Sequence, residues 1–218
     1  MKPARTLRIA TLALLLLAVS ACPEDVKQEE RKATQDLLLD QFDATSFPTS
    51  TWTITGTGTL VQDLAVGAPA PAMRLDSTGT PAGLISAPLE AGAHFRVSIA
   101  IDPAPGSGAS ASFVLRNASG GAVVASVTVE EGQITYVMGA AAPVVKTWTT
   151  DGAFHVFEFE GSNSSVSGGH WWKRDGSLEA SHLQPTGASY MTMGLEGTSS
   201  GNAWFDHAWV FRYLAYPH

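Results

Sequence analysis

Residues 94–102 read His-Phe-Arg-Val-Ser-Ile-Ala-Ile-Asp, the clearest strand pattern in the chain. Apolar side chains from Phe95 to Ile101 alternate with polar or small ones. Because successive side chains of a strand point to opposite faces, the pattern predicts one face packed on a core and one facing water. The segment therefore predicts an antiparallel strand in a layered domain.

The same kind of pattern continues along the chain from about residue 41. Short runs of β-branched and aromatic residues are interrupted by Gly, Pro, Ser, Asn and Asp, and no helical apolar period lasts beyond two turns. These runs predict strands near 51–55, 59–63, 72–76, 83–87, 94–102, 110–117, 122–130, 133–139, 144–149, 154–161, 166–174, 189–196 and 203–213. So many short strands predict an all-β fold, a two-sheet antiparallel jelly-roll sandwich over residues 41–218.

The N-terminus resembles the signal peptide of a bacterial lipoprotein, over residues 1–21. Three basic residues precede an apolar run at 9–19, which reaches only about 16 Å as a helix and is too short for a bilayer core of about 30 Å. The run ends in Val-Ser-Ala-Cys22, which resembles a lipobox. The resemblance implies that Cys22 is lipidated and anchors the protein to the bacterial cell envelope, at the outer membrane or cell surface, facing the periplasm or the exterior. An ordinary signal peptide with a coincidental cysteine is the alternative.

Charge and cysteine content exclude several classes of function. After Cys22, a charged segment without aromatic residues extends to residue 40 and predicts a flexible or partly helical tether. The chain has 13 basic and 20 acidic residues, so removing the three basic residues of the signal leaves 10 against 20, a net charge of −10. Without a basic cluster, nucleic acid is not an expected partner. A single cysteine excludes an internal disulfide and a cysteine-rich zinc site.

Several motifs resemble the concanavalin A-like lectin/glucanase superfamily and its laminin G-like domains. Residues 154–161 are similar to the "W-H" strand of that superfamily, 172–176 to its "Y-V-D-G" hairpin, and 203–211 to its closing strand. The opening residues agree in order: Asp40-Gln-Phe-Asp43, Trp52, Met73-Arg-Leu-Asp76 and Phe95. The resemblance covers about residues 41–213 and implies the same jelly-roll sandwich.

The superfamily contains enzymes, and their motifs are missing here. Laminarinase-type glycoside hydrolases carry E-x-D-x-x-E on one strand, and this run does not occur. Glu158 and Glu160 form a same-face pair, but they lie on the strand that resembles the "W-H" strand, not where the resemblance places catalysis. A solvated strand face is the simpler interpretation. The Arg-rich and Gln-x-His strands of the alginate-lyase branch are absent too, so the sequence predicts a domain that is not an enzyme.

Metal ligands are few in the sequence pattern. The six histidines show no His-x-His or HxxxH spacing, which argues against a transition-metal centre. Asp206 matches an Asp of the closing strand that in the superfamily often helps to hold a calcium ion, so the resemblance implies a structural calcium there. The alternative is that Asp206 only caps a bend or accepts backbone hydrogen bonds. No other cofactor is expected.

Residues 168–174, Gly-Gly-His-Trp-Trp-Lys-Arg, are the densest candidate for sugar recognition. Sugars stack on exposed aromatic rings flanked by polar groups. Because successive side chains of a strand point to opposite faces, Trp171 and Lys173 lie on one face and His170 and Trp172 on the other. The resemblance implies that Trp172 packs inside, which leaves Trp171 exposed. We name Trp171, Lys173 and His170 as candidate carbohydrate-binding residues. The alternative is that both tryptophans simply cover the sandwich.

Together these patterns predict a lipid-anchored envelope protein whose lectin-like sandwich binds carbohydrate or another surface polymer. Because this fold hosts many functions, two alternatives stay open. One is a structural or adhesive module that binds an envelope protein and has no small-molecule site. The other is an atypical glycoside hydrolase or lyase.

Overall fold

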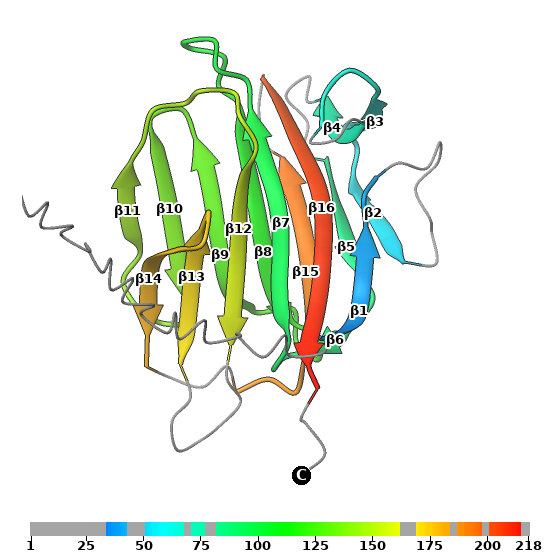
Figure 1. Cartoon of the computed structure of the whole chain (residues 1–218), viewed down its shortest axis with the longest axis vertical. Coiled ribbons are helices and arrows are strands. Elements are labelled where there is room, and N and C mark those ends of the chain that lie inside the picture. Colours follow the sequence, from blue (N-terminus) through cyan, green and yellow to red (C-terminus); the bar gives the residue numbers. More distant parts are fainter. Residues whose placement is uncertain are drawn as a thin grey trace, which may run out of the picture. The chain divides into compact units, whose positions relative to one another are not determined.

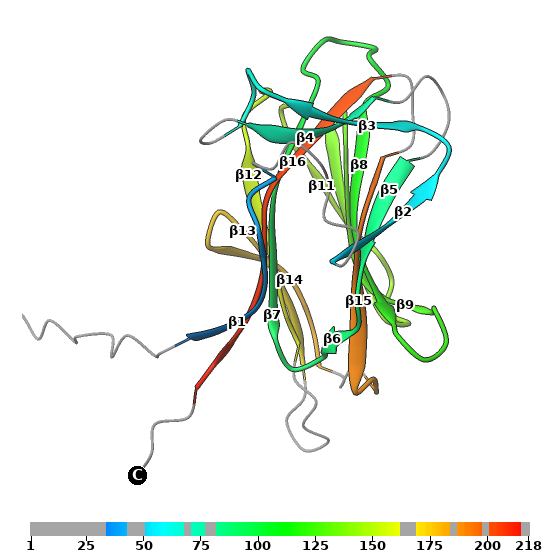
Figure 2. The same ribbon diagram turned by 90° about the vertical axis from the view of Figure 1, so that its right-hand side faces the viewer.

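The computed structural model describes residues 34–42, 51–67, 71–76, 82–161, 169–183, 187–197 and 201–214. These residues form strands and no helix, and the strands build two antiparallel sheets that pack face to face (Figures 1 and 2). No helix in this part of the chain is long and apolar enough to cross a membrane. The predicted all-β two-sheet sandwich is confirmed. The signal peptide, Cys22 and the first part of the tether lie outside the described residues and stay predictions.

Sheet A is the layer nearer the viewer in Figure 1, and its strands run in the order β14-β13-β12-β7-β16-β4-β3, with β1 also paired to β16. Its strands are β1 (Thr34–Asp40), β3 (Thr59–Asp63), β4 (Ala72–Asp76), β7 (His94–Ile101), β12 (His155–Gly161), β13 (His170–Arg174), β14 (Ser177–His182) and β16 (Asn202–Tyr213). The strand that decided the fold class, β7, lies near the middle between β12 and β16.

Sheet B is the other layer, with the order β11-β10-β9-β8-β15-β5-β2 and β6 paired to β15. Its strands are β2 (Trp52–Gly56), β5 (Ala82–Ser86), β6 (Leu89–Glu90), β8 (Ser110–Asn117), β9 (Val123–Glu130), β10 (Gln133–Met138), β11 (Val144–Thr147) and β15 (Tyr190–Gly197). Non-consecutive neighbours such as β8 and β15 join distant parts of the chain, as a jelly roll requires.

The core lies between the two sheets and follows the alternation of the strands. In β7 the side chains of Phe95, Val97 and Ile99 are buried against sheet B, while Arg96 points to the outer face. The same alternation places Phe157 and Phe159 of β12 in the core. These aromatic and branched side chains belong to the apolar core that the two sheets remove from water.

The sandwich begins before the predicted boundary at residue 41. Thr34–Asp40, placed in the tether by the sequence, forms β1 and pairs antiparallel with β16. Leu38 is buried, and the carboxylate of Asp40 accepts the indole N–H of Trp52 at 2.7 Å. The segment looked too polar for a strand, but its two aspartates at 36 and 40 accept hydrogen bonds from indoles that lie elsewhere in the sequence. Only the residues before Thr34 remain as the predicted tether.

The hairpin predicted at Asp175-Gly176 is present. Both residues have positive φ, 50° and 79°, as the two-residue hairpin turn requires. It connects β13 to β14, a polar strand that the apolar pattern did not predict. The strand predicted from residue 166 begins at His170, and residues 162–168 lie outside the described part of the chain.

Candidate functional site

Two rows of side chains cross the outer face of sheet A at right angles to its strands. The four strands β13, β12, β7 and β16 lie next to one another, and their pairing register sets which residues form each row. The first row consists of Trp171, Glu160, His94 and Phe211. The second row consists of Lys173, Glu158, Arg96 and Trp209. Because neighbouring strands lie about 4.8 Å apart, each row spans about 14 Å. Chain segments far apart in sequence thus place aromatic and charged groups side by side.

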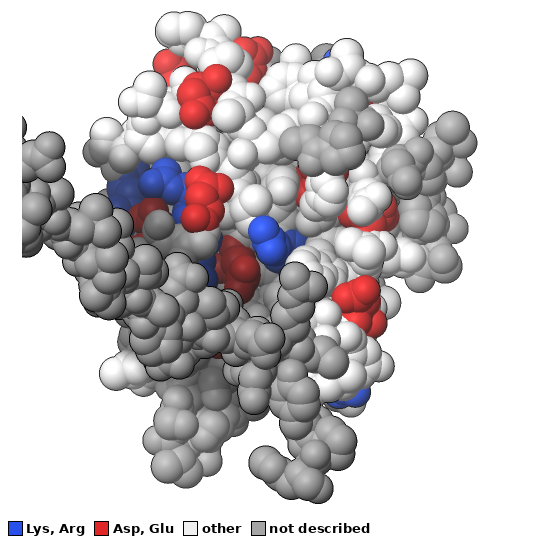
Figure 3. Space-filling view, viewed as in Figure 1, with Lys and Arg blue, Asp and Glu red and all other residues white. Residues whose placement is uncertain are grey.

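Charged side chains form a compact cluster at the centre of these rows. The Lys173 ammonium lies 3.1 Å from a carboxylate oxygen of Glu160 and 3.9 Å from one of Glu158. The imidazole Nδ1 of His94 lies 3.3 Å from the same oxygen of Glu158. In the space-filling view of this face, acidic and basic side chains lie together near its middle (Figure 3). We call His94, Glu158, Glu160 and Lys173 the charged cluster.

Neighbouring groups in the charged cluster favour the ionised forms of Glu158 and Lys173. The hydrogen bond from His94, together with the positive charges of Lys173 and Arg96, lowers the pKa of Glu158 despite its partial burial. Burial disfavours the Lys173 ammonium, but the hydrogen bond to Glu160 and the charges of both glutamates raise the pKa of Lys173. A carboxyl with a lowered pKa stays charged near neutral pH, so Glu158 suits cation binding or a nucleophilic role better than that of a general acid.

The two adjacent tryptophans point to opposite sides of sheet A, as predicted. Trp172 is fully buried in the core, and Trp171 is half-buried on the outer face beside Lys173. The indole of Trp171 lies against the backbone of Gly169, where a Cβ would come within 2.7 Å of the ring. Gly169 therefore gives the ring the space to lie against the sheet.

Trp209 ends the second row, but its ring is already in contact with protein groups. It stacks on Phe211 with ring centroids 4.1 Å apart, and the Arg96 guanidinium lies 5.9 Å from its centroid. Its indole N–H donates to Asp36 of β1 at 2.8 Å. Trp209 therefore supports the face, and Trp171 is the other tryptophan of these rows, half-buried beside Lys173.

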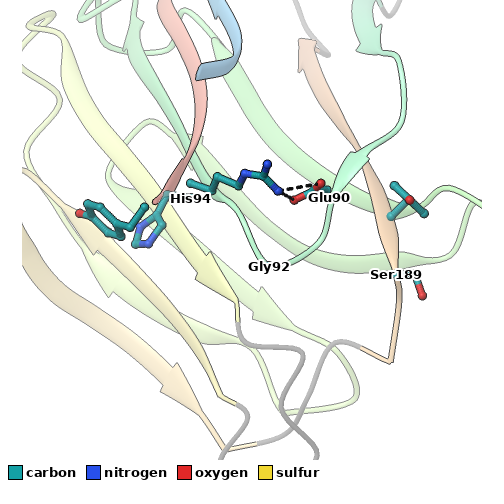
Figure 4. Close-up of a pocket in the computed structure, with 7 residues that line it drawn as sticks. Glu90, Gly92, His94 and Ser189 are labelled. Atoms are coloured by element: carbon teal, nitrogen blue, oxygen red, sulfur yellow. Dashed lines mark hydrogen bonds and ion pairs between the residues drawn. The ribbon is translucent and has the colours of Figure 1, made fainter. Parts of the chain in front are cut away.

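A pocket of about 510 Å³ adjoins the charged cluster where β7 begins and β16 ends. It is lined by Glu90, Gly92, His94, Ser189, Tyr190, Arg212 and Tyr213. Figure 4 shows the imidazole of His94 on one side and the carboxylate of Glu90 on the other, where the carboxylate pairs with the Arg212 guanidinium at 2.8 and 3.1 Å. Tyr190 and Tyr213 are about half exposed. Its volume lies within the range of small-ligand sites, and its lining is more polar than is usual for them.

His170 is not brought together with Trp171 and Lys173. It lies on the inner side of β13, 2% exposed, against the ring of Phe159. Both of its ring nitrogens are buried without a hydrogen-bond partner, and it lies opposite His182 of β14. Burial, with a smaller effect of His182, lowers the pKa of His170, so the imidazole is neutral at pH 7. Its position corrects the expectation that it contacts a ligand at the surface.

We expect His170→Leu to stabilise the domain by about 1 kcal/mol at pH 7, since a buried polar group without a partner costs about 1–3 kcal/mol. The gain should grow below pH 6.5, where the unfolded chain takes up a proton that the folded chain excludes. Urea unfolding at pH 8.0, 7.0 and 5.5 measures both effects. An identical pH dependence of the two proteins would show that His170 does not cause the acid sensitivity.

Asp206 is fully buried within β16 and serves the backbone. Its Oδ1 accepts the backbone N–H of His207 at 2.7 Å and lies 3.0 Å from the imidazole Nδ1 of the same residue. His207 has a positive φ of 49°, and the pairing register of β16 with β7 shifts between Asp206 and Trp209. The carboxylate thus holds a bulge, the structural role that the sequence left open. One carboxylate oxygen is already engaged by His207, and calcium at Asp206 stays a prediction.

Neither the charged cluster nor the pocket was predicted from the sequence. Histidine spacing within one segment cannot detect them, because His94 meets Glu158 across 64 residues of chain through the pairing of β7 with β12. The one available signal was the same-face pair Glu158 and Glu160, which was interpreted as a solvated face. Both glutamates lie partly exposed on the outer face of sheet A, and there they also face Lys173 and His94.

No family model matches this chain, and no curated protein matches it either. Solved structures do match. An endo-β-1,3-glucanase from Pyrococcus furiosus has a TM-score of 0.61 at 10% identity, covering 84% of this chain and 96% of the other. The carbohydrate recognition domain of Emp46p, in its potassium-bound form, has a TM-score of 0.60 at 10% identity, with 83% and 97% covered. A Crh5 transglycosylase in complex with NAG has a TM-score of 0.57 at 15% identity, with 85% and 86% covered.

These likenesses show that the domain has the concanavalin A-like fold, as the motifs implied. They also correct the prediction that the domain is not an enzyme. That prediction relied on the missing E-x-D-x-x-E motif, whereas structures that share the fold include a glucanase and a transglycosylase. It was wrong because the absence of one motif excludes one catalytic arrangement and not catalysis as such. At such low identities the likeness establishes the fold and assigns no activity.

Proposed function

We propose that this domain binds carbohydrate on the outer face of sheet A, along a track from Trp171 across the charged cluster to the pocket. The observation that carries the proposal is the position of Trp171. Its indole is half-buried on an outer strand face, next to the ion pair of Lys173 and Glu160. A flat aromatic ring can stack on the apolar side of a sugar ring, while the ion pair offers a donor and an acceptor to its hydroxyls.

The track offers aromatic surface at both ends. From Trp171 it passes Glu160 and reaches His94, two strand spacings or about 10 Å away. His94 also lines the pocket, where the rings of Tyr190 and Tyr213 are accessible. A ligand that extends over several sugar units would contact both ends, so we propose an oligosaccharide or polysaccharide as the ligand.

Sheet B offers less for stacking. Among its described strands the one tryptophan is Trp52, which is buried. Its outer face carries small hydroxyl side chains such as Ser112 and Thr128, bonded to each other, and the ion pair of Arg116 with Glu196. Tyr190, the first residue of β15, is exposed but lines the pocket at the end of the track, so the tryptophan content favours sheet A.

Solved structures with this fold support carbohydrate as the ligand class, because they include a β-1,3-glucanase and a carbohydrate recognition domain. β-1,3-Glucan oligosaccharides are accordingly the first probe, followed by a glycan array. Reducing ends are counted in the same incubations, because hydrolases share the fold. Release of reducing ends that Glu158→Gln or Glu160→Gln abolishes would extend the proposal from binding to hydrolysis.

We expect Trp171→Ala to weaken binding of the best oligosaccharide at least tenfold, measured by isothermal titration calorimetry, because one stacked ring contributes about 1.4 kcal/mol or more. The melting temperature should change little, since the ring is half-buried on the outer face. Trp204→Ala is the matched control, a half-buried tryptophan of β16 that donates to Asp63 away from the track. Equal affinity of Trp171→Ala and the unchanged protein, or binding of no glycan at all, would refute the proposal.

A further inference from the structure

Three potential metal ligands converge within the charged cluster. The Nδ1 atom of His94 and one carboxylate oxygen each of Glu158 and Glu160 all lie within 4.8 Å of one another. Nδ1 is 3.3 Å from the Glu158 oxygen and 4.0 Å from the Glu160 oxygen. Two ligands of a tetrahedral zinc ion, each about 2.0–2.2 Å from the metal, lie about 3.3–3.6 Å apart. Side-chain shifts of less than about 1 Å would therefore bring all three atoms to bonding distance.

Two rigid strands hold these ligands in place. His94 begins β7, and Glu158 and Glu160 are two residues apart on β12, so the paired strands aim all three side chains at one point. The His94 ring is fixed by stacking on Phe211, with centroids 5.0 Å apart, and by the edge of Tyr213 at 4.8 Å. The His94 side chain is 10% exposed. A ligand that is already oriented loses little entropy when it binds an ion.

A positive charge already sits at this point. The Lys173 ammonium lies 3.1 Å from Oε2 of Glu160 and 3.9 Å from Oε1 of Glu158. These are the two carboxylate oxygens that face His94 and would bind the ion. Two carboxylates thus share one ammonium, and the positive charge of Arg96 also acts on Glu158. The Lys173 side chain is 33% exposed on a flexible stem, so it can withdraw into water. A divalent cation would then neutralise both carboxylates.

The ion pairs of His155 differ in geometry from those of His94. This histidine also pairs with two carboxylates, but its Nδ1 faces Asp175 at 2.7 Å and its Nε2 faces Asp151 at 3.2 Å. The two carboxylates lie on opposite edges of the ring and cannot share one ion with it. Convergence on a single nitrogen therefore distinguishes His94 from an ordinary ion-paired histidine. His94 also lines the pocket, which is open to solvent.

We propose that His94, Glu158 and Glu160 form a binding site for a divalent transition-metal ion, with Zn²⁺ the best match, in which the ion and the Lys173 ammonium compete for the same carboxylates. Imidazole nitrogen and carboxylate oxygen suit Zn²⁺, and three protein ligands leave one position for water. The proposal goes beyond carbohydrate binding and does not depend on it.

The test is titration of the full chain with Zn²⁺ by calorimetry in the absence of any sugar, and with Co²⁺ by visible absorption. We expect one ion per chain and a tetrahedral Co²⁺ spectrum. Lys173→Met should tighten binding about tenfold, because it removes the competing cation. His94→Gln should weaken binding at least tenfold, and circular dichroism verifies that this variant is folded. His155→Gln is the matched control and should bind as the unchanged protein does.

Several results would overturn the metal site. Lack of binding to both the unchanged protein and Lys173→Met would exclude it. So would equal affinity of His94→Gln and the unchanged protein, or a loss of binding in His155→Gln as large as that in His94→Gln. An unaltered affinity in Lys173→Met would reject the competition between lysine and metal. Because no glycan is present, failure here leaves the carbohydrate proposal standing, and failure to bind glycans leaves the metal site standing.

Discussion

Trp172→Ala is expected to destabilise the domain by about 3–5 kcal/mol, the cost of truncating a buried aromatic side chain. Trp172 is fully buried and joins the two sheets. From sheet A its ring contacts Phe113 of β8, with centroids 5.3 Å apart, and its indole N–H donates to the carbonyl of Val137 in β10 at 3.3 Å. Its removal leaves a cavity where the layers meet and deletes this hydrogen bond between them.

Urea unfolding followed by far-UV circular dichroism measures this loss, with Trp171→Ala as the matched control. The two tryptophans are neighbours in β13, so both variants remove the same side chain from the same strand. They differ only in the side of sheet A from which the ring is removed. Trp171→Ala should cost less than about 1 kcal/mol, because its ring is half-buried and leaves no interior cavity. Similar losses in both variants would mean that the orientation of β13 is different from the one described.

Removal of β1 is also expected to lower the stability of the domain strongly. A fragment that starts at residue 41 should be less stable than one that starts at residue 33 by about 3 kcal/mol or more. Burial of Leu38 contributes about 1.5–3 kcal/mol, and the charged hydrogen bond from Trp52 to Asp40 about as much. The shorter fragment also leaves the end of β16 partly unpaired, which favours association between molecules.

Thermal unfolding and size-exclusion chromatography of the two fragments measure these effects. Adjacent leucines provide the control within the longer fragment, since Leu38 is 8% exposed and Leu39 is 53% exposed. Leu38→Ala should reproduce part of the loss, and Leu39→Ala should leave the melting temperature nearly unchanged. Equal stability of the two fragments would show that Thr34–Asp40 belongs to the tether, as the sequence suggested.

The layers and most strands of this domain could be predicted, because alternation within a strand and turn residues between strands are local signals. β1, β6 and β14 could not, since none of them has a long enough run of alternating apolar and polar residues to predict a strand. Asp36 and Asp40 of β1 gain their role only when the indoles of Trp209 and Trp52 arrive from elsewhere in the chain. The residues near β1 in the sequence give no sign of these distant hydrogen-bond donors.

The candidate site was predictable only in part. The opposite orientations of Trp171 and Trp172 follow from a two-residue period, and the structure agrees. The meeting of His94 with Glu158 depends on the register between β7 and β12. A shift of one strand by one residue would turn its side chains to the other face of the sheet, so the two residues would no longer meet. His170 was named for its place in an aromatic-rich run, yet the same two-residue period that exposes Trp171 turns His170 inward.

The site of glycan contact can be located directly by ¹⁵N-edited NMR during titration with β-1,3-glucan oligosaccharides or the best ligand from the array. The six tryptophan indole N–H groups report on different parts of the domain. Binding on sheet A predicts the largest shift at the indole of Trp171, with further shifts at backbone amides of β12, β13 and the start of β7. Shifts confined to β8, β9 and β10 of sheet B, with the Trp171 indole unmoved, would contradict it.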